Sequence, residues 1–162
     1  NSARVKARDA RRIADVRQIQ LALELYADAN NQSYPRGVES SVGSLFFKDI
    51  ATSYIQQIPA DPALVVAAGD YQYRALIGNG ATDGYCSVTS QSCGFYHMGA
   101  NLEQSTNGAL NGDADACSTA ATGCLKVYNN TDIQGGPDNS ASGNKDCLNG
   151  TANGRYCYDI TP

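Results

Sequence analysis

The sequence contains no tryptophan, one histidine and one methionine, and only 17% of its 162 residues are charged. That charged fraction lies below the roughly 25% typical of soluble domains. A single histidine and the absence of any C-x-x-C pair argue against structural zinc. No run approaches the roughly 20 apolar residues needed to cross a bilayer, and no stretch of these residues has the pattern expected of a signal peptide. The length is that of one domain, residues 1–162. We expect no membrane span among these residues.

Common catalytic motifs are also absent. The sequence has no G-x-S-x-G motif, no phosphate-binding glycine loop and no paired acidic motif in a helical register. The single histidine, His97, lies in an alternating stretch, which is typical of a strand residue at a surface or in a packed sheet. An even number of cysteines argues that none is a free nucleophile. We therefore expect a protein that is not an enzyme.

All six cysteines lie in the second half of the chain, with spacings of C-x6-C, C-x6-C and C-x9-C. An even set of cysteines without metal-type spacing is typical of disulfides formed in an oxidising compartment. Because each couple stands in its own stretch of predicted loop, we expect neighbours to pair. The predicted disulfides are Cys86–Cys93, Cys117–Cys124 and Cys147–Cys157.

The formal net charge of −4 is unevenly distributed along the chain. Residues 1–17 hold six basic and two acidic side chains, whereas the remaining residues hold six basic and fourteen acidic ones. This division indicates that the two parts face different environments. The acidic body disfavours nonspecific binding to a phosphate backbone, so we expect no nucleic-acid partner.

Residues 2–31 are predicted to form one long helix, because they contain no glycine or proline and are rich in good helix formers. Asn30 and Asn31 are expected to end it. The stripe of large apolar residues begins only at Ile13, so the N-terminal third is expected to protrude with little to pack against. The stripe consists of Ile13, Val16, Ile19, Leu23 and Tyr26.

The remaining pattern predicts a second helix over 41–57, ended by the prolines of 58–62, and then a change to strand periodicity. Alternating strands are expected at 71–77 and 95–102, with a shorter one at 155–160. Residues 104–154 are poor in large apolar residues and need disulfides to stay ordered. The predicted fold class is α+β: a long N-terminal helix packs on a short helix and a three- or four-stranded antiparallel sheet. A disulfide-clipped, loop-rich C-terminal region completes it.

Several of these segments resemble type IV pilins and type II secretion pseudopilins. The stretch 6–26 is similar to their long N-terminal spine helix, and Tyr34-Pro35 follows at the matching place. The stretches 54–62 and 71–73 also match in order, and 96–103 is similar to a family strand that ends in Leu-Glu. The resemblance implies a spine helix over 1–31, a helix, connector and strand pair over 32–103, and a divergent Cys-rich region over 104–162. It also implies that the natural precursor continues the helix upstream through a basic leader, a cleavage site and an apolar segment.

The resemblance implies a structural subunit that self-associates into a cell-surface or periplasmic filament. Its partners would be other pilin subunits and the assembly machinery of the inner membrane, which would anchor the precursor before assembly. The basic side chains near the N-terminus would then meet acidic groups of adjacent subunits. These candidate interface residues are Arg4, Arg8, Arg11, Arg12 and Arg17. The choice between a type IV pilus and a secretion pseudopilus stays open.

A calcium site is one interpretation of the C-terminal region. The run 111–115 places oxygen ligands at alternate positions as an EF-hand loop does, but Ala116 and Thr122 replace the required glycine and glutamate. A looser site built on glycine-rich loops suits Ca²⁺, and the region corresponds to the calcium loop of major pseudopilins. The alternative is solvated turns. The candidate ligands are Asp113, Asp115, Asp132 and Asp138.

A second hypothesis for function is a secreted binding or adhesion module that uses a tyrosine-rich sheet face. The chain has 10 tyrosines, and most of them follow the predicted strands and loops. Tyrosine is also common as the lining of a half-buried sheet, which requires no ligand. The tyrosines concerned are Tyr71, Tyr73, Tyr85, Tyr96, Tyr128, Tyr156 and Tyr158.

Overall fold

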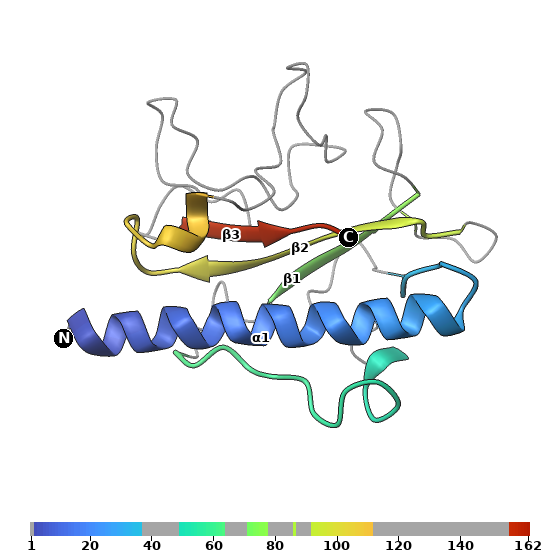
Figure 1. Cartoon of the computed structure of the whole chain (residues 1–162), viewed down its shortest axis with the longest axis horizontal. Helices are drawn as coiled ribbons and strands as arrows, with labels where there is room; N and C mark the ends of the chain where they lie inside the picture. Colours follow the sequence, from blue (N-terminus) through green and yellow to red (C-terminus); the bar gives the residue numbers. More distant parts are fainter. Residues whose placement is uncertain (1, 37–48, 64–70, 78–85, 87–91, 112–155) are drawn as a thin grey trace, which may run out of the picture.

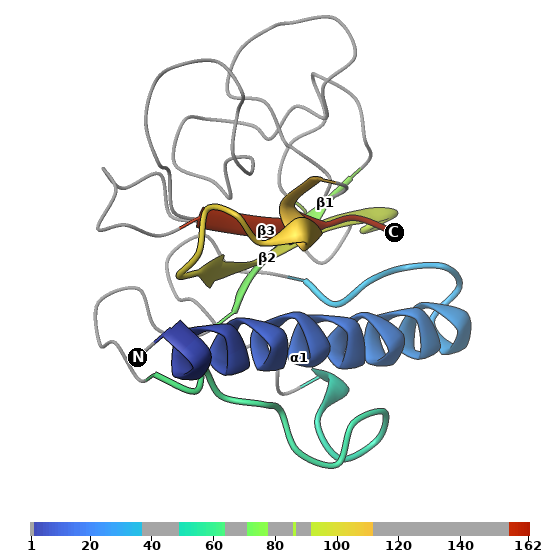
Figure 2. The same cartoon turned by 60° about the vertical axis from the view of Figure 1, so that its left-hand side comes forward.

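A computed structural model describes residues 2–36, 49–63, 71–77, 86, 92–111 and 156–162. In chain order the elements are the helix α1 (Ser2–Ala29), the strands β1 (Gln72–Leu76) and β2 (Phe95–Leu102), the short 3-10 helix η1 (Gly108–Asn111) and the strand β3 (Tyr156–Ile160). Figures 1 and 2 show α1 lying between the sheet on one side and the segment 49–63 on the other. The predicted arrangement of a long helix packed on an antiparallel sheet is confirmed.

The helix α1 ends where the asparagines predict. Gln32 donates its backbone N–H to the carbonyl of Ala27 at 2.8 Å, and Asn31 takes a left-handed conformation with φ 55°. The side chain of Asn30 donates to the carbonyl of Tyr26 at 2.8 Å. These bonds satisfy carbonyls of the last turn, and asparagine tolerates the left-handed backbone better than most residues.

The three described strands form one sheet in the order β1-β2-β3, and both pairings are antiparallel. Tyr73 lies opposite Met98 in the first pair, and Ala100 lies opposite Tyr158 in the second. Because side chains alternate across a strand, these four residues share the face that packs on α1. The predicted strands at 71–77, 95–102 and 155–160 match β1, β2 and β3 to within a residue at each end.

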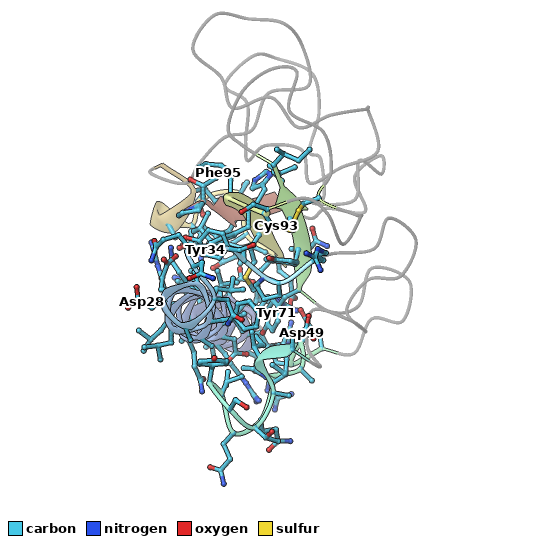
Figure 3. All side chains as sticks on the ribbon, turned by 90° about the vertical axis from the view of Figure 1, so that its right-hand side faces the viewer. Asp28, Tyr34, Asp49, Tyr71, Cys93 and Phe95 are labelled. Atoms are coloured by element: carbon cyan, nitrogen blue, oxygen red, sulfur yellow. A yellow bond between two sulfur atoms is a disulfide. The ribbon has the colours of Figure 1, made fainter. Side chains whose placement is uncertain are left out.

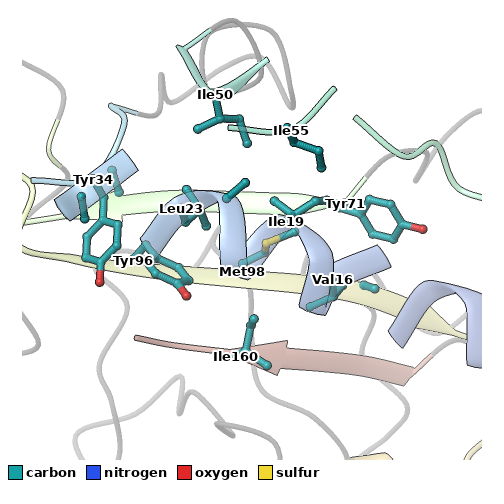
Figure 4. Packing of buried hydrophobic residues seen from close by; sticks show 14 of the residues in the cluster. Val16, Ile19, Leu23, Tyr34, Ile50, Ile55, Tyr71, Tyr96, Met98 and Ile160 are labelled. Atoms are coloured by element: carbon teal, nitrogen blue, oxygen red, sulfur yellow. The ribbon is translucent and has the colours of Figure 1, made fainter. Parts of the chain in front are cut away.

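The hydrophobic core lies between α1, the sheet and the segment 49–63. Val16, Ile19 and Leu23 on α1 have no exposed surface and face Tyr96 and Met98 of β2 (Figure 4). Each fully buried aliphatic side chain contributes roughly 1.5–3 kcal/mol relative to an exposed one. The segment 49–63 closes the opposite side of this core with buried Ile50 and Ile55 and with half-buried Tyr54 and Ile58.

The disulfide Cys86–Cys93 is present and completely buried, with its Cα atoms 5.4 Å apart. Backbone hydrogen bonds connect each of the two cysteines to a neighbouring segment. Cys86 N–H donates to the carbonyl of Ala75 in β1 at 3.0 Å, and Tyr34 N–H donates to the carbonyl of Cys93 at 2.8 Å. The bridge therefore ties β1, the start of β2 and the segment after α1 together. Neighbour pairing is confirmed for this couple.

The other two predicted disulfides fall outside the described residues. Cys117, Cys124 and Cys147 belong to the stretch 112–155, and Cys157 is described only through its backbone in β3.

The second predicted helix is wrong in its C-terminal half. Its predicted start at 41–48 lies outside the described residues, helical backbone is found at Asp49 and Ile50, and turns and a bridge follow from Ala51. Thr52 takes a left-handed φ of 66°, and its N–H donates to the carbonyl of Ile55 at 2.8 Å. The turn buries Ile55 in the core, so tertiary packing overrides a weak helical preference in this stretch.

Candidate functional site

The N-terminal half of α1 is anchored by a group of charged side chains, here called the Arg12 cluster (Arg8, Asp9, Arg12, Asp61 and Glu103). The Arg12 side chain is 1% exposed. Its Nε and Nη2 donate to the two carboxylate oxygens of Asp61 at 2.7 and 2.9 Å. Its Nη1 donates to Asp9 at 2.9 Å and to Glu103 at 2.7 Å. One guanidinium thus joins the helix, the connector and the end of β2.

Asp9 and Arg8 complete the Arg12 cluster. Asp9 has no exposed surface, and its carboxylate accepts the backbone N–H groups of Glu103 at 2.9 Å and Gln104 at 3.1 Å. Arg8 donates to both carboxylate oxygens of Glu103, with its Nε 2.7 Å from Oε1. The helix therefore provides the acceptor for two backbone groups that follow β2, which fixes its axial position on the sheet.

Arg12 stays charged in this environment. Burial lowers the pKa of Arg12, but hydrogen bonds and charges from Asp61 and Glu103 raise it by more, so the net pKa lies above its usual range. Removing one member of such a buried pair leaves an uncompensated charge, which costs about 3–5 kcal/mol.

The expectation that the N-terminal third of α1 has little to pack against is wrong from Arg8 onward. Residues 2–7 are exposed, apart from half-buried Val5, but Asp9 and Arg12 are buried. The contact is made by ion pairs instead of apolar side chains. Sequence periodicity missed it because the partners Asp61 and Glu103 lie 49 and 91 positions from Arg12.

Two of the five arginines proposed for a filament interface belong to the Arg12 cluster. Arg12 is buried, and Arg8 is paired with Glu103 within the same chain. Arg4 is exposed, and Arg11 is 61% exposed with Asp15 at 3.7 Å. Arg17 Nη1 donates a hydrogen bond to Gln20 Oε1 at 3.0 Å, and its guanidinium carbon lies 5.9 Å from the centre of the Tyr158 ring. Arg17 is also exposed.

The side of α1 opposite the core, here called the outer face, carries exposed apolar residues. Leu21 is 62% exposed and Leu25 is 46% exposed, one helical turn apart. Figure 3 looks along α1 and shows Asp28 on the side away from Tyr71 and Asp49. The outer face is defined by Ala3, Ala7, Ala10, Ala14, Leu21, Leu25 and Asp28, all exposed and recurring at steps of three, four or seven residues.

Small residues over the N-terminal half and leucines over the C-terminal half make the outer face suitable for packing against another helix. Charged side chains flank it. Lys6 and Arg11 stand beside the alanines, and Asp28 stands beside the leucines, all exposed. The outer face is thus basic at its N-terminal end and acidic at its C-terminal end.

The tyrosines of the described residues line the interior. Tyr71, Tyr96 and Tyr158 are at most 2% exposed. The Tyr34 and Tyr96 rings meet edge to face at 4.7 Å, and both hydroxyls donate to Glu24, at 3.0 and 3.2 Å. Burial and the Glu24 hydrogen bond raise the pKa of Tyr34 to about 12.

These tyrosines pack between the sheet and α1, so they do not form an open platform. Tyr73 is half-buried, and its hydroxyl donates to the carbonyl of Pro35 at 2.7 Å. Tyr85, Tyr128 and the side chain of Tyr156 lie outside the described residues. Within the described part of the sheet, the lining interpretation of the tyrosines is the one that fits.

The candidate calcium ligands Asp113, Asp115, Asp132 and Asp138 all lie outside the described residues. Over the described ranges, no group of three or more His, Cys, Asp or Glu residues could hold a metal ion. His97 is 1% exposed within β2, so it is a packed strand residue. None of the helices in the described part has both the length and the apolar character of a membrane span.

Comparison with protein-family models, with curated proteins and with solved structures found no match to this chain.

Proposed function

We propose that this chain is a non-catalytic structural subunit of a filament of the type IV pilin or type II secretion pseudopilin kind. The observation that carries the proposal is the outer face of α1. A 28-residue helix buries one side in its own domain and leaves alanines and two leucines exposed on the other. Single exposed apolar residues are ordinary, but apolar residues that recur on one side of a helix are typical of a helix that packs on further helices.

The Arg12 cluster supports this proposal because it fixes the helix to the rest of the domain. A helix that transmits contacts along a filament must not slide over its own sheet. The apolar core holds α1 from Val16 onward, and the ion pairs hold it from Arg8 to Arg12. The two sets together give the helix one axial position over most of its length.

Several features of the filament follow from the resemblance and remain proposals. The precursor would be anchored in the inner membrane by an apolar continuation of α1 and would be assembled there. The filament would stand at the cell surface or in the periplasm, where the disulfides would survive. The pilin-like topology itself is part of this proposal.

The experiment that tests the proposal is immunogold electron microscopy of the source cells with an antibody raised against this chain. We expect gold labels at regular intervals along surface or periplasmic filaments. The upstream gene sequence should encode a basic leader, a cleavage site and an apolar segment that continues the helix. Label confined to free secreted protein, with a cleaved secretory signal ending near Asn1, would overturn the proposal in favour of a secreted binding module.

Calcium separates the two kinds of filament. If calcium raises the melting temperature of the chain and a chelator reverses this rise, the result would support the pseudopilin assignment. Replacing Asp113 and Asp115 by asparagine should then abolish the rise. An unchanged melting temperature would support the pilus. Either result leaves the filament proposal intact, because the outer face lies on a different part of the chain.

A further inference from the structure

The exposed surface of α1 before Glu24 carries cations and no exposed carboxylate. Asp9 and Asp15 are the two acidic residues of this stretch, and both are buried. Both also accept hydrogen bonds inside the domain: Asp9 from two backbone N–H groups, and Asp15 from the Tyr71 hydroxyl at 2.5 Å. The exposed charged side chains of the stretch are Arg4, Lys6, Arg11 and Arg17.

These four cations stand in two rows, one on each side of the outer face. Arg4 and Arg11 are separated by about two helical turns, and Lys6 and Arg17 by about three. At about 100° per residue, the two pairs fall on opposite flanks of the outer face, with its alanines and Leu21 between them. The result is an exposed row of apolar residues bordered by positive charge on both sides.

We propose that this part of the outer face binds the surface of a bilayer that contains anionic phospholipid. An apolar row flanked by cations is typical of helices that lie in the interface of a membrane. The alanines and Leu21 face the boundary between headgroups and acyl chains. The long arginine and lysine side chains on both flanks reach the lipid phosphates while their aliphatic stems cover apolar surface.

A bilayer suits these residues better than two other partners do. A nucleic acid would meet the same cations, but its phosphate backbone offers no apolar surface to the row between them, and the rest of the chain is acidic. The same stretch of a second copy would bring cations against cations, because residues 2–23 expose no carboxylate. Only the bilayer matches both the apolar row and the charges beside it.

The far end of the outer face limits the contact. Asp28 is exposed on the same side of the helix, and an anionic surface repels it. The contact therefore runs from Ala3 to Leu21, a length of about 27 Å, with the N-terminal end nearest the lipid. The inference goes beyond the proposed function, because this contact requires neither a filament nor an apolar continuation of α1.

Vesicle binding by the 162-residue chain tests this surface. The chain is sedimented with increasing amounts of vesicles made of phosphatidylglycerol and phosphatidylcholine, and with vesicles of phosphatidylcholine alone. A cation near an anionic bilayer contributes about fivefold to binding, so R4Q/K6Q should bind the mixed vesicles on the order of 30-fold more weakly than the parent. Both positions lie in the exposed stretch 2–7, so the domain should fold as before, which far-ultraviolet circular dichroism checks.

The matched control is Q56E/Q57E, which changes the net charge by the same amount. Both glutamines are exposed on the segment 49–63, away from α1, and screening by salt should keep their effect on binding within about twofold. Equal losses for the two variants would overturn the inference. So would absence of binding by the parent, or equal binding to vesicles of phosphatidylcholine alone.

The absence of tryptophan from the chain allows the apolar contact itself to be followed. Ala7→Trp places an indole on the outer face, and Gln57→Trp places one on the segment 49–63. We expect the mixed vesicles to shift the emission of the first variant to shorter wavelength and to leave that of the second unchanged. Equal shifts, or no shift in either variant, would overturn the inference. A shift of Ala7→Trp that grows with protein concentration without vesicles would assign the face to a second copy instead.

A duplex DNA fragment separates a lipid contact from general phosphate binding. We expect the DNA to leave the chain on the mixed vesicles when phosphate concentrations are equal. Displacement of the chain by the DNA, with DNA binding that R4Q/K6Q weakens by the same factor as vesicle binding, would overturn the bilayer as the partner.

Discussion

Arg12 and Asp61, 49 positions apart in the sequence, form a two-point pair with N–O distances of 2.7 and 2.9 Å. The pair joins the middle of α1 to the connector that follows the segment 49–57. Asp61 also accepts the backbone N–H of Ala63 at 2.8 Å, so the same carboxylate shapes the turn in which it stands. One ion pair therefore links the orientation of α1 to the backbone conformation of the connector that contains Asp61.

Replacing Arg12 by alanine should destabilise the domain severely. The change leaves the carboxylates of Asp9, Asp61 and Glu103 with one buried cation fewer, and we expect a loss of about 3–5 kcal/mol in the free energy of unfolding. Urea denaturation followed by circular dichroism measures it. Arg11→Ala is the matched control, because Arg11 is 61% exposed and should change stability by about 0.5 kcal/mol or less. Equal losses for the two variants would show that the cluster is not an anchor.

The Cys86–Cys93 disulfide should stabilise the domain by about 2–3 kcal/mol, the amount that the entropy of closing so short a loop predicts. The double variant C86S/C93S removes the bridge without leaving an unpaired thiol. Its urea midpoint should fall accordingly. Since the bridge also orders Ser33 and Tyr34 through Cys93, amide hydrogen exchange at Tyr34 should accelerate more than exchange at Val16. Uniform acceleration would argue against this local coupling.

Sequence patterns predicted those elements whose signals are local. The absence of glycine and proline through residues 2–31 predicts α1, and the change to strand periodicity predicts β1 and β2. Neighbour spacing predicts the Cys86–Cys93 bridge. Each of these features depends on residues within one short stretch, so periodicity and spacing carry the necessary information.

Features that depend on distant partners could not be predicted in this way. The burial of Arg12 depends on Asp61 and Glu103, and no local pattern around Arg12 indicates either residue. The segment after Ile50 shows a related limit. Ile50 and Ile55 are buried, but a turn achieves this burial where the pattern predicts a helix. Apolar spacing indicates which residues enter the core more securely than it indicates the backbone that carries them.

The hydroxyls of the buried tyrosines should lose their protons at a higher pH than exposed tyrosines do. Burial, followed by the hydrogen bond to Glu24, raises the pKa of Tyr34 to about 12, and burial also raises the pKa of Tyr71 and Tyr96 above the usual range. A raised pKa in the folded state means that this contribution to stability is intact below pH 10 and is lost as the pH rises toward 12. Absorbance titration of tyrosinate should show a native curve displaced to higher pH than the curve in urea.

Tyr34→Phe provides the control for that titration. It should remove one late-titrating group from the native curve and leave the curve in urea with one tyrosine fewer near pH 10. Coincident native and unfolded curves for the parent chain would contradict the burial of these hydroxyls.

The outer face should be needed for assembly and not for folding. Because Leu21 and Leu25 are 62% and 46% exposed, L21D and L25D change few contacts inside the domain, and we expect the melting temperature of the double variant to fall by only a few degrees. In the assembled state the same change would bury two new carboxylates against a neighbouring helix, which is costly without partners. Immunogold labelling should therefore show folded protein without filaments.

Gln57→Asp is the control for the added charge, since Gln57 is exposed in the segment 49–63 and lies off α1. Cells carrying it should form filaments as the parent does. Assembly by L21D/L25D at the parental level would show that α1 does not pack through this face, whatever else holds the subunits together. Loss of assembly by Gln57→Asp as well would locate the contact on the segment beneath the helix. The two variants together therefore distinguish assembly through the outer face of α1 from assembly through the segment 49–63, which lies on the core side of the helix.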